Sequence, residues 1–358
     1  MNAADWIRPD IQALTAYAVQ DATGLIKMDA MENPYPWPVS LDAAWNQALN
    51  AVALNRYPDP QAEALQAALV DAFGIPSDMQ LILGNGSDEI IQMIALALIG
   101  EDKQQRTVLS VEPGFAMYRI IATCCGLNYH GVPLQADFHL DLPAMLQAIE
   151  KHQPAVVYLA YPNNPTGNLF DDSDIQQILQ AAPGLVVIDE AYAPFTHNSY
   201  LSQLGQYDNL VVMRTVSKMG LAGLRLGLLA GPADWLTAFN KVRLPYNINS
   251  LTQASATFAL QHKTVFDAQA AQICAERERL SQALATLPGV TVYPSQANFI
   301  LMRTPKNQAT PWFEYLKQQG ILIKNMHGAH PLLHDCLRPT VGTPAENNAL
   351  LAALRKIT

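Results

Sequence analysis

Lys218 is the residue whose setting in the sequence most suggests chemistry. It follows an apolar run at 210–213, which is typical of a buried strand, and Ser217 stands directly before it. A lysine held at a strand end in a desolvated pocket can lose its proton and attack a carbonyl carbon. The alternative is a solvated surface lysine, so the rest of the chain has to supply the other parts of a site.

Asp189 ends a second apolar run, at 185–188. A carboxylate at the end of a buried strand is costly unless it meets a cation or hydrogen-bond donors. A protonated pyridine nitrogen is such a partner, and Asp189 would keep it protonated. A reactive lysine and a pyridine ring together indicate pyridoxal phosphate as a cofactor. The alternative is an aspartate that caps the next helix.

The segment GNGSD at 84–88 has the features of a phosphate site. It follows an apolar run and precedes a helical pattern. Glycines permit tight turns, and the first N–H groups of a helix, together with its dipole, attract anions. Gly86, Ser87 and Asp88 are therefore candidate phosphate-binding residues. The alternative is a glycine loop in which Ser87 or Asp88 is an ordinary N-cap.

Two further segments follow apolar runs. Asn164 lies in AYPNNPTG at 160–167, whose residues are those of a turn, and its amide could donate to the phenolic oxygen of the cofactor. Phe115 lies in EPGFAMY at 112–118 and could stack on a flat ring. The alternative for Phe115 is a place in the core, as for most aromatic residues at strand ends.

The elements that would position these residues form an alternating pattern. Apolar runs at 81–83, 107–111, 155–159, 185–188 and 210–213 predict strands, and helical patterns lie between them, for example at 88–99 and 172–179. Continuously apolar strands are typical of a parallel sheet that is covered on both faces. We therefore expect an α/β fold with a doubly wound, mostly parallel sheet, which binds ligands beyond the carboxyl ends of its strands.

The two ends of the chain predict a second, smaller unit. Residues 40–245 form the predicted large cofactor-binding domain, and residues 246–358 with the proline-rich arm 1–39 form a small α+β domain. In the small domain we expect one long helix over 252–284, strands at 290–292, 299–301 and 321–323, and a closing helix from residue 345.

Composition limits the class of protein. The chain has 358 residues, half of them apolar, and a formal net charge of −9 without a basic run, which argues against nucleic acid or an anionic membrane as a partner. The longest apolar stretch, 90–99, is too short to span a membrane. Four cysteines show no metal-binding spacing, and we expect a cytoplasmic protein without disulfides.

The motifs occur in an order that resembles a known group. GSDE at 86–89, NNPTG at 163–167, DEAY at 189–192 and SK at 217–218 resemble the fold-type-I aminotransferases, which use pyridoxal phosphate. ENPY at 32–35, NRYPD at 55–59, LAGLR at 221–225 and CLRPTVGT at 336–343 are similar to the histidinol-phosphate aminotransferase family. The likeness extends from about residue 28 to the end of the chain.

The resemblance implies a role for each matching residue. Lys218 would carry the cofactor as an imine, Asp189 would pair with the ring nitrogen, and both are the predicted catalytic residues. Asn164 and Tyr192 would contact the phenolic oxygen. The implied cofactor-binding residues are Tyr57, Gly86, Ser87, Asp88, Phe115, Asn164, Asp189, Tyr192, Ser217, Lys218 and Arg225.

The resemblance also implies substrates and a partner. Arg338 would bind an anionic end of the substrate, with Lys324 and Tyr17 beside it; the alternative for Arg338 is a salt bridge to Glu346. Tyr57 would reach the phosphate of the cofactor in a second subunit, which implies a homodimer with shared active sites.

Three features depart from the pattern of the family. The step from Lys218 to Arg225 is seven residues instead of eight, Lys324 stands where relatives often carry a second substrate arginine, and Phe115 replaces a tyrosine. The implied reaction converts histidinol phosphate and oxoglutarate to imidazole-acetol phosphate and glutamate, in histidine biosynthesis. An aromatic amino acid aminotransferase, a threonine-phosphate decarboxylase and a cofactor-binding regulator without catalysis are the alternatives.

Overall fold

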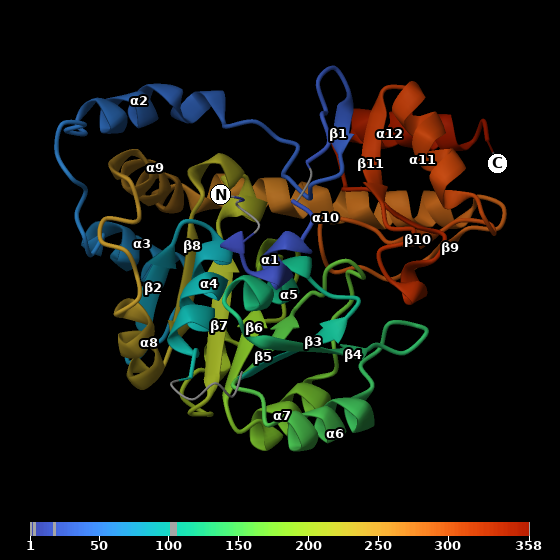
Figure 1. The fold of residues 1–358 in the computed structure, drawn as a ribbon. Helices are drawn as coiled ribbons and strands as arrows, with labels where there is room; N and C mark the ends of the chain where they lie inside the picture. The colour runs from blue at the N-terminus through green and yellow to red at the C-terminus, as the bar shows by residue number, and fades with distance from the viewer. Residues whose placement is uncertain (1, 3–4, 17–18, 101–105, 358) are drawn as a thin grey trace.

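The larger of two β-sheets carries most of the predicted strands. A computed structural model describes residues 2, 5–16, 19–100 and 106–357, and in this part of the chain the larger sheet has seven strands in the order β2-β8-β7-β6-β5-β3-β4 (Figure 1). Strands β3 to β7 run parallel to one another, and β8 runs antiparallel to its neighbours β2 and β7. The bounds are β2 Gln80–Gly84, β3 Thr107–Glu112, β4 Asn128–Pro133, β5 Val156–Ala160, β6 Leu185–Asp189, β7 Leu210–Thr215 and β8 Gly227–Gly231.

Helices cover both faces of this sheet because its strands are apolar on both sides. In β5, Val156 and Tyr158 belong to one buried cluster, whereas Val157 and Leu159 belong to another. The first cluster includes side chains of α4 (Ser87–Ala97), α5 (Ala116–Cys124) and α8 (Ala233–Asn240). The second includes side chains of α3 (Glu63–Phe73), α6 (Leu142–His152) and α7 (Asp172–Ala181). The predicted doubly wound, mostly parallel sheet is confirmed.

A smaller sheet joins the two ends of the chain. Its strands lie in the order β1-β11-β12-β10-β9, and the N-terminal strand β1 pairs parallel with β11. Helices α11 (Ala309–Gln318) and α12 (Pro344–Leu354) contribute to its buried cluster. The bounds of its strands are β1 Ile26–Met28, β9 Thr291–Val292, β10 Met302–Arg303, β11 Ile321–Asn325 and β12 Cys336–Arg338.

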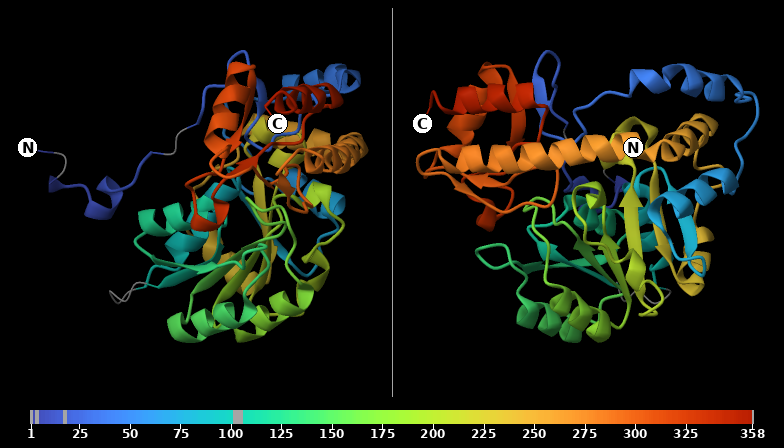
Figure 2. Two further views of the ribbon diagram at one scale, coloured as in Figure 1. Left: turned by 90° about the vertical axis from the view of Figure 1, so that its right-hand side faces the viewer. Right: turned by 180° about the vertical axis from the view of Figure 1, so that it is seen from behind.

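Two helices connect the sheets where the sequence predicted one. The chain leaves the helical conformation at His262 (φ −111°), between α9 (Ser250–Gln261) and α10 (Lys263–Ala285), so the prediction of a single helix over 252–284 is wrong. Helix α9 packs on α3 and α2 (Asp42–Asn50), whereas α10 crosses from the large unit to the small one (Figure 2). Phe266 of α10 lies in the core of the large unit and Ile273 in that of the small unit. The domain division at residue 245 stays a prediction.

Other differences from the sequence predictions have local causes. Strand β4 was not predicted because its sequence, NYHGVP, is only partly apolar, and β8 was not predicted because GLLAG begins and ends with glycine. The strand predicted at 299–301 is found at 302–303, and Phe299 forms only an isolated bridge to Thr340. The short helix α1 (Pro9–Gln12) lies against α5. Among the described residues, no helix is both long enough and apolar enough to cross a membrane.

Candidate active site

The residues predicted to hold the cofactor surround one cavity of about 250 Å³. Its walls are the carboxyl ends of β5, β6 and β7, the start of α4, the short turns η5 (Ser217–Met219) and η6 (Ala222–Leu224), and residues 30–32 of the N-terminal arm. The predicted residues in its lining are Ser87, Asp88, Phe115, Asn164, Asp189, Tyr192, Ser217, Lys218 and Arg225. The structure thus brings together residues from the ends of β5, β6 and β7 and from the starts of α4 and α5.

Asp189 presents a buried carboxylate at the end of β6, with 4% of its surface exposed. Its Oδ2 accepts a hydrogen bond of 2.6 Å from Tyr118 Oη, and its Oδ1 accepts one of 3.0 Å from the N–H of Ala191. No ion pair to Asp189 is found in the described part of the chain. Burial raises the pKa of Asp189 to about 6, although both hydrogen bonds oppose that shift.

The neighbouring Glu190 shows what a buried structural carboxylate looks like in this protein. Its Oε2 lies 2.6 Å from Arg214 Nη2 and accepts a hydrogen bond of 3.0 Å from Ser199. Glu190 is thus neutralised within the fold, whereas Asp189 meets only neutral donors among the residues that the structure describes. A cation from outside the chain would complete the environment of Asp189 and not that of Glu190.

Lys218 faces the same cavity from η5. Its Nζ donates to the carbonyl oxygen of Ala30 at 3.4 Å and lies 5.8 Å from the centroid of the Tyr192 ring. Burial, together with the nearby charges of Arg338 and Arg225, lowers the pKa of Lys218 to about 8. A lysine with this pKa is partly neutral near physiological pH, and the neutral amine is the form that can accept a proton.

The start of α4 forms an anion site. Its N-cap, Gly86, has φ 86° and no side chain, so no side-chain cap occupies the first N–H groups of the helix. A Cβ at Gly86 would lie 2.5 Å from Arg225 Nη2, so only glycine lets that guanidinium approach. Arg225 Nη2 lies 3.8 Å from Asp88 Oδ2. Arg225 thus reaches α4 despite the short step from Lys218, and its own backbone is left-handed (φ 50°).

Arg338 contacts the cavity lining from the small sheet, through Asn164. It lies on β12 with 5% of its surface exposed, and its Nη1 donates to Asn164 Oδ1 while its Nη2 donates to the carbonyl of Asp29. Asn164 Nδ2 in turn donates to Tyr192 Oη at 3.2 Å. Glu346, the alternative partner of Arg338, instead caps the start of α12.

The remaining predicted residues lie outside the lining of the cavity. Lys324 on β11 pairs with Arg338 across the two antiparallel strands, so both side chains belong to the same face of the small sheet. Tyr57 is 80% exposed and stacks on Tyr246 with ring centroids 4.6 Å apart. Tyr17 lies outside the described residues. The roles of all the predicted site residues stay predictions.

Three contributions to the site were not predicted. Tyr118 donates to Asp189 from the first turn of α5. Its position three residues after Phe115, a predicted site residue, was the feature of the sequence that could have indicated it. Thr215 Oγ1 lies 2.9 Å from Ser217 Oγ and accepts the Ser217 N–H, a link that the two-residue spacing allows. The carbonyl of Ala30 contacts Lys218 across 188 residues of sequence, and no local pattern indicates it.

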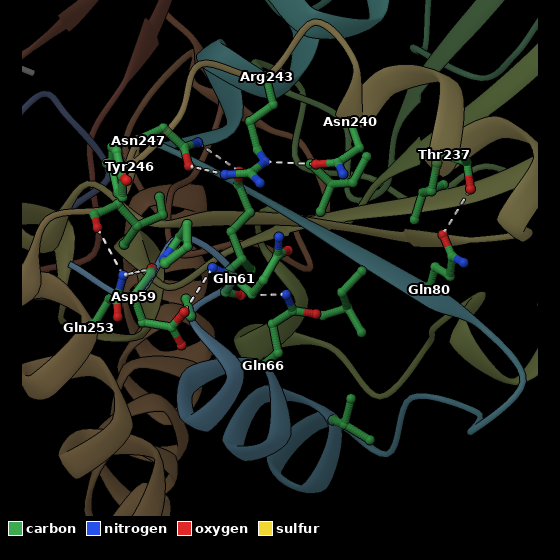
Figure 3. Close-up of a pocket in the computed structure, with 18 of the residues that line it drawn as sticks. Asp59, Gln61, Gln66, Gln80, Thr237, Asn240, Arg243, Tyr246, Asn247 and Gln253 are labelled. Atoms are coloured by element: carbon green, nitrogen blue, oxygen red, sulfur yellow. Dashed lines mark hydrogen bonds between the residues drawn. The ribbon is translucent and has the colours of Figure 1, made fainter. Parts of the chain in front are cut away.

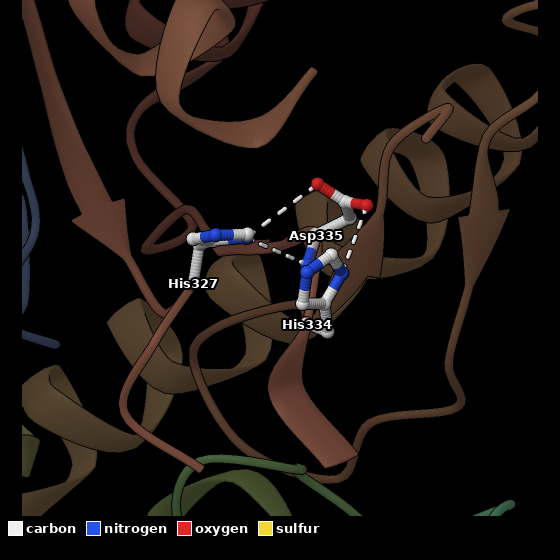
Figure 4. A group of neighbouring side chains, drawn as sticks. All are labelled: His327, His334 and Asp335. Carbon is white, nitrogen blue, oxygen red and sulfur yellow. Dashed lines mark hydrogen bonds and ion pairs between the residues drawn. The ribbon is translucent and has the colours of Figure 1, made fainter. Parts of the chain in front are cut away.

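A second cluster of titratable side chains lies apart from this cavity. His327, His334 and Asp335, in the connection between β11 and β12, place possible ligand atoms within 4.8 Å of one another (Figure 4). Their polar atoms are engaged with each other: His327 Nδ1 accepts the N–H of Asp335 at 3.1 Å, and His334 Nδ1 lies 3.0 Å from Asp335 Oδ2. Asp335 Oδ2 also accepts the N–H of Asn307. We interpret the cluster as a structural group that stabilises this connection.

The residues of the cavity fit pyridoxal phosphate. Asp189 has no cationic partner in the described ranges of the chain, and a protonated pyridine nitrogen would supply one. The uncapped start of α4 and Arg225 suit a phosphate group, and Lys218 is the only lysine in the lining of the cavity, as far as the described residues show. The arrangement can therefore bind the cofactor at both ends and place an amine between them.

Comparison with known proteins gives the class of this protein. Residues 23–354 match the family described as aminotransferase class I and II. The chain belongs to this family, and pyridoxal phosphate is its cofactor. A relative from Nitrosococcus oceani, named histidinol-phosphate aminotransferase 2, is 56% identical over 354 residues, which cover 99% of this chain and 98% of the relative.

Other relatives point to the same group within the family. The histidinol-phosphate aminotransferase of Chromobacterium violaceum is 53% identical over 350 residues, which cover 98% of this chain and 97% of the relative. The crystal structure of the histidinol-phosphate aminotransferase from Sinorhizobium meliloti, in complex with pyridoxal-5'-phosphate, superposes with a TM-score of 0.87 at 26% identity and covers 98% of each chain. The resemblance seen in the sequence is confirmed.

Proposed function

We propose that this aminotransferase acts on histidinol phosphate and oxoglutarate and forms imidazole-acetol phosphate and glutamate. The observation that carries the proposal is the identity of 56% and 53%, over nearly the whole chain, to proteins that bear the name of this activity. The charge of the site agrees with it. An anionic substrate needs local cations because the chain is acidic overall, and Arg338 and Lys324 lie next to each other on the small sheet.

The cofactor supplies an electron sink for the pair of electrons released when the α-carbon of the substrate loses its proton. Asp189 stabilises the positive charge on the ring nitrogen, because its buried carboxylate finds no other cation among the described residues. Tyr118 and the N–H of Ala191 hold the carboxylate in one orientation. The start of α4, Ser217 and Arg225 bind the phosphate.

Lys218 moves the proton. With a pKa lowered to about 8, its Nζ can accept the proton from the α-carbon and return it at a neighbouring atom. The carbonyl of Ala30 orients the amine through a hydrogen bond. Asn164 links the two ends of the site, since its amide donates to Tyr192 Oη and accepts from Arg338.

A half-reaction screen tests the proposed substrate. The holoenzyme is mixed with a panel of amino donors, and the absorption band of the cofactor is followed. Histidinol phosphate and glutamate should change the band fastest. Faster reaction of phosphate-free aromatic amino acids would favour the aromatic aminotransferase. Release of carbon dioxide from threonine phosphate would favour the decarboxylase, and no spectral change with any amine would favour a regulator.

We also infer a homodimer in which Tyr57 serves the active site of the partner. Tyr57 is exposed in one subunit, and four more exposed apolar side chains belong to the neighbouring segments: Leu54, Leu244, Tyr246 and Leu251. Apolar side chains that gather on a surface are typical of an interface. A single subunit leaves the stacked rings of Tyr57 and Tyr246 open to solvent. The expected cytoplasmic location stays a prediction.

Mixed dimers test the shared site. Subunits with Lys218→Ala are exchanged with subunits with Tyr57→Phe, and activity is measured after subunit exchange has been proven. In a mixed dimer one site carries both defects and the other carries neither, so activity should rise above that of either parent. No rise would show that Tyr57 acts within its own subunit.

A further inference from the structure

The phosphate-binding loop at 83–86 has a second cavity behind it. This cavity, of about 480 Å³, lies between α3, β2, α8 and the connection that follows α8, and polar side chains line it (Figure 3). Leu83 borders this second cavity, whereas Ser87 and Asp88 border the cofactor cavity. The loop therefore connects a residue that borders the second cavity to residues that border the cofactor cavity.

A chain of hydrogen bonds reaches the loop from the side of the second cavity. Arg243 Nη1 donates to Asn247 Oδ1 at 3.0 Å (Figure 3). Asn247 Nδ2 donates to the carbonyl of Leu83 and to Glu89 Oε2, both at 2.9 Å. Glu89 Oε2 also accepts the N–H of Asn85 at 2.6 Å. The amide of Asn247 thus uses both its oxygen and its nitrogen, and the two ends of the loop are held from one side.

The position of Glu89 in α4 matters for the anion site. An acidic residue at the third helical position commonly accepts the N–H of the N-cap residue. Here the N-cap is Gly86, and Glu89 reaches one residue further back, to Asn85. The start of the helix is fixed in this way without a side chain on its first N–H groups, which stay available for a phosphate.

We propose that Glu89 and Asn247 are positioning residues, which hold residues 83–86 in the shape that binds the phosphate of the cofactor. The proposal rests on pyridoxal phosphate as the cofactor. Glu89 acts through geometry and not through its charge, because a carboxylate near a phosphate opposes its binding. A glutamine at this position can accept the same hydrogen bonds without the charge and should preserve binding.

The test compares pyridoxal phosphate with pyridoxal, which lacks the phosphate. Both ligands are titrated into the full-length apoenzyme, and binding is followed by absorbance. In Glu89→Ala and Asn247→Ala, the dissociation constant of pyridoxal phosphate should rise about tenfold, as expected for the loss of one hydrogen bond. The dissociation constant of pyridoxal should change less than twofold. Glu89→Gln should bind both ligands as the wild type does.

Asn240→Ala is the matched control. Asn240 accepts a hydrogen bond from Nε of the same Arg243, at 2.8 Å, but in the described part of the chain no hydrogen bond joins its side chain to the loop (Figure 3). Its substitution should leave both dissociation constants within twofold of the wild type. Asn247→Ala and Glu89→Ala are independent probes of the loop, so a folding defect in one leaves the test to the other.

Three outcomes overturn the proposal. Equal weakening of pyridoxal and pyridoxal phosphate would show a general loss of structure. Unchanged affinity for pyridoxal phosphate in both alanine variants would show that the loop holds its shape unaided. An effect of Asn240→Ala as large as that of Asn247→Ala would place the cause in the second cavity as a whole. Failure of the wild type to bind pyridoxal phosphate would contradict the assignment of the cofactor instead.

Discussion

The cofactor end and the substrate end of the active site differ in how the fold builds them. Asp189 ends β6 and pairs with Met213 of the neighbouring strand β7, and Ser217 and Lys218 follow directly after β7 in the turn η5. Arg338 and Lys324 lie on two strands of the small sheet. Their distance from the cofactor depends on how the two units pack together, through α10 and the N-terminal arm.

We infer from this difference that the large sheet carries the residues for the reaction and the small sheet those for substrate specificity. The large sheet carries most of the cofactor cavity, which residues 30–32 of the N-terminal arm complete. The small sheet carries two cationic side chains, Arg338 and Lys324, which we propose select an anionic substrate. We therefore expect substitutions at the cofactor end to affect every substrate equally, and substitutions at the substrate end to affect substrates according to their charge.

Lys218→Ala should have the largest effect, because it removes the only amine of the cavity lining among the described residues. Loss of the base and of covalent attachment should lower kcat by about 10⁴-fold or more for all substrates. Borohydride reduction of the wild type should label one peptide, which contains Lys218. Lys241→Ala, at an exposed lysine, is the control and should retain full activity. A label on any other lysine would contradict the assignment.

Asp189→Asn should lower the activity of the holoenzyme and raise the folding stability of the apoenzyme. In the holoenzyme it leaves a buried cation without its partner, which costs about 3–5 kcal/mol and should lower kcat/KM by about two to three powers of ten. In the apoenzyme the folded pKa of about 6 exceeds the ordinary value of 3.8, so ionisation of Asp189 opposes folding. Stability should fall as pH rises between these values, by about 3 kcal/mol at pH 7.

Chemical denaturation of both apoproteins between pH 4 and pH 7 measures this difference (about 1.36 kcal/mol per pKa unit). Asp189→Asn should remove most of the loss of stability with rising pH. Glu190→Gln is the control, because it breaks the buried pair with Arg214 and should destabilise the apoenzyme at pH 7. Equal destabilisation by both substitutions would mean that Asp189 is a structural carboxylate as well.

Arg338→Ala should have an intermediate effect on kcat/KM, which is confined to reactions with anionic substrates. Charge-assisted hydrogen bonds contribute about 1.5–3 kcal/mol each, so kcat/KM should fall by about one to two powers of ten for anionic substrates. Arg277 is a matched control: it is also 5% exposed, but it donates to the carbonyls of Phe195 and Ala297 inside the fold. Arg277→Ala should lower the melting temperature more than the activity, and the opposite ranking would contradict the role of Arg338.

Lys324→Ala should have the smallest effect, and the most selective one. A partly exposed lysine contributes about 1 kcal/mol, so kcat/KM for histidinol phosphate should fall about fivefold. For a phosphate-free aromatic amino acid it should stay unchanged, and Lys324→Arg should be tolerated. Lys306→Ala, at an exposed lysine, is the control. An equal loss for both substrates would show that Lys324 does not recognise phosphate.

The sequence predicts which residues gather around the cofactor cavity, because most of them lie at the ends of predicted strands. Asp189 and Lys218 follow long apolar runs, and parallel strands place their carboxyl ends along one edge. The bond from Ala30 to Lys218 was not predictable in this way, since no periodic pattern relates residues 188 positions apart. The break at His262 was missed because the helical pattern continues on both sides of it, while the two helices pack on different cores.

The substrate end was predicted only through the resemblance. Nothing in the run at 336–338 shows by itself that Arg338 reaches Asn164, because that contact joins two sheets. The pairing of Lys324 with Arg338 likewise depends on the register of β11 and β12, which the connection between these strands determines.

The N-terminal strand also sets the order in which the enzyme can be completed during synthesis. Met28 accepts a hydrogen bond from the N–H of Thr340, and Met31 donates to the side chain of the same threonine across 309 residues. A ribosome therefore makes this wall of the cavity 309 residues before its partner Thr340. Contacts between such distant residues form late because closing so long a loop costs entropy. The nascent chain can assemble its large sheet before Thr340 is added, yet it gains a finished active site only afterwards.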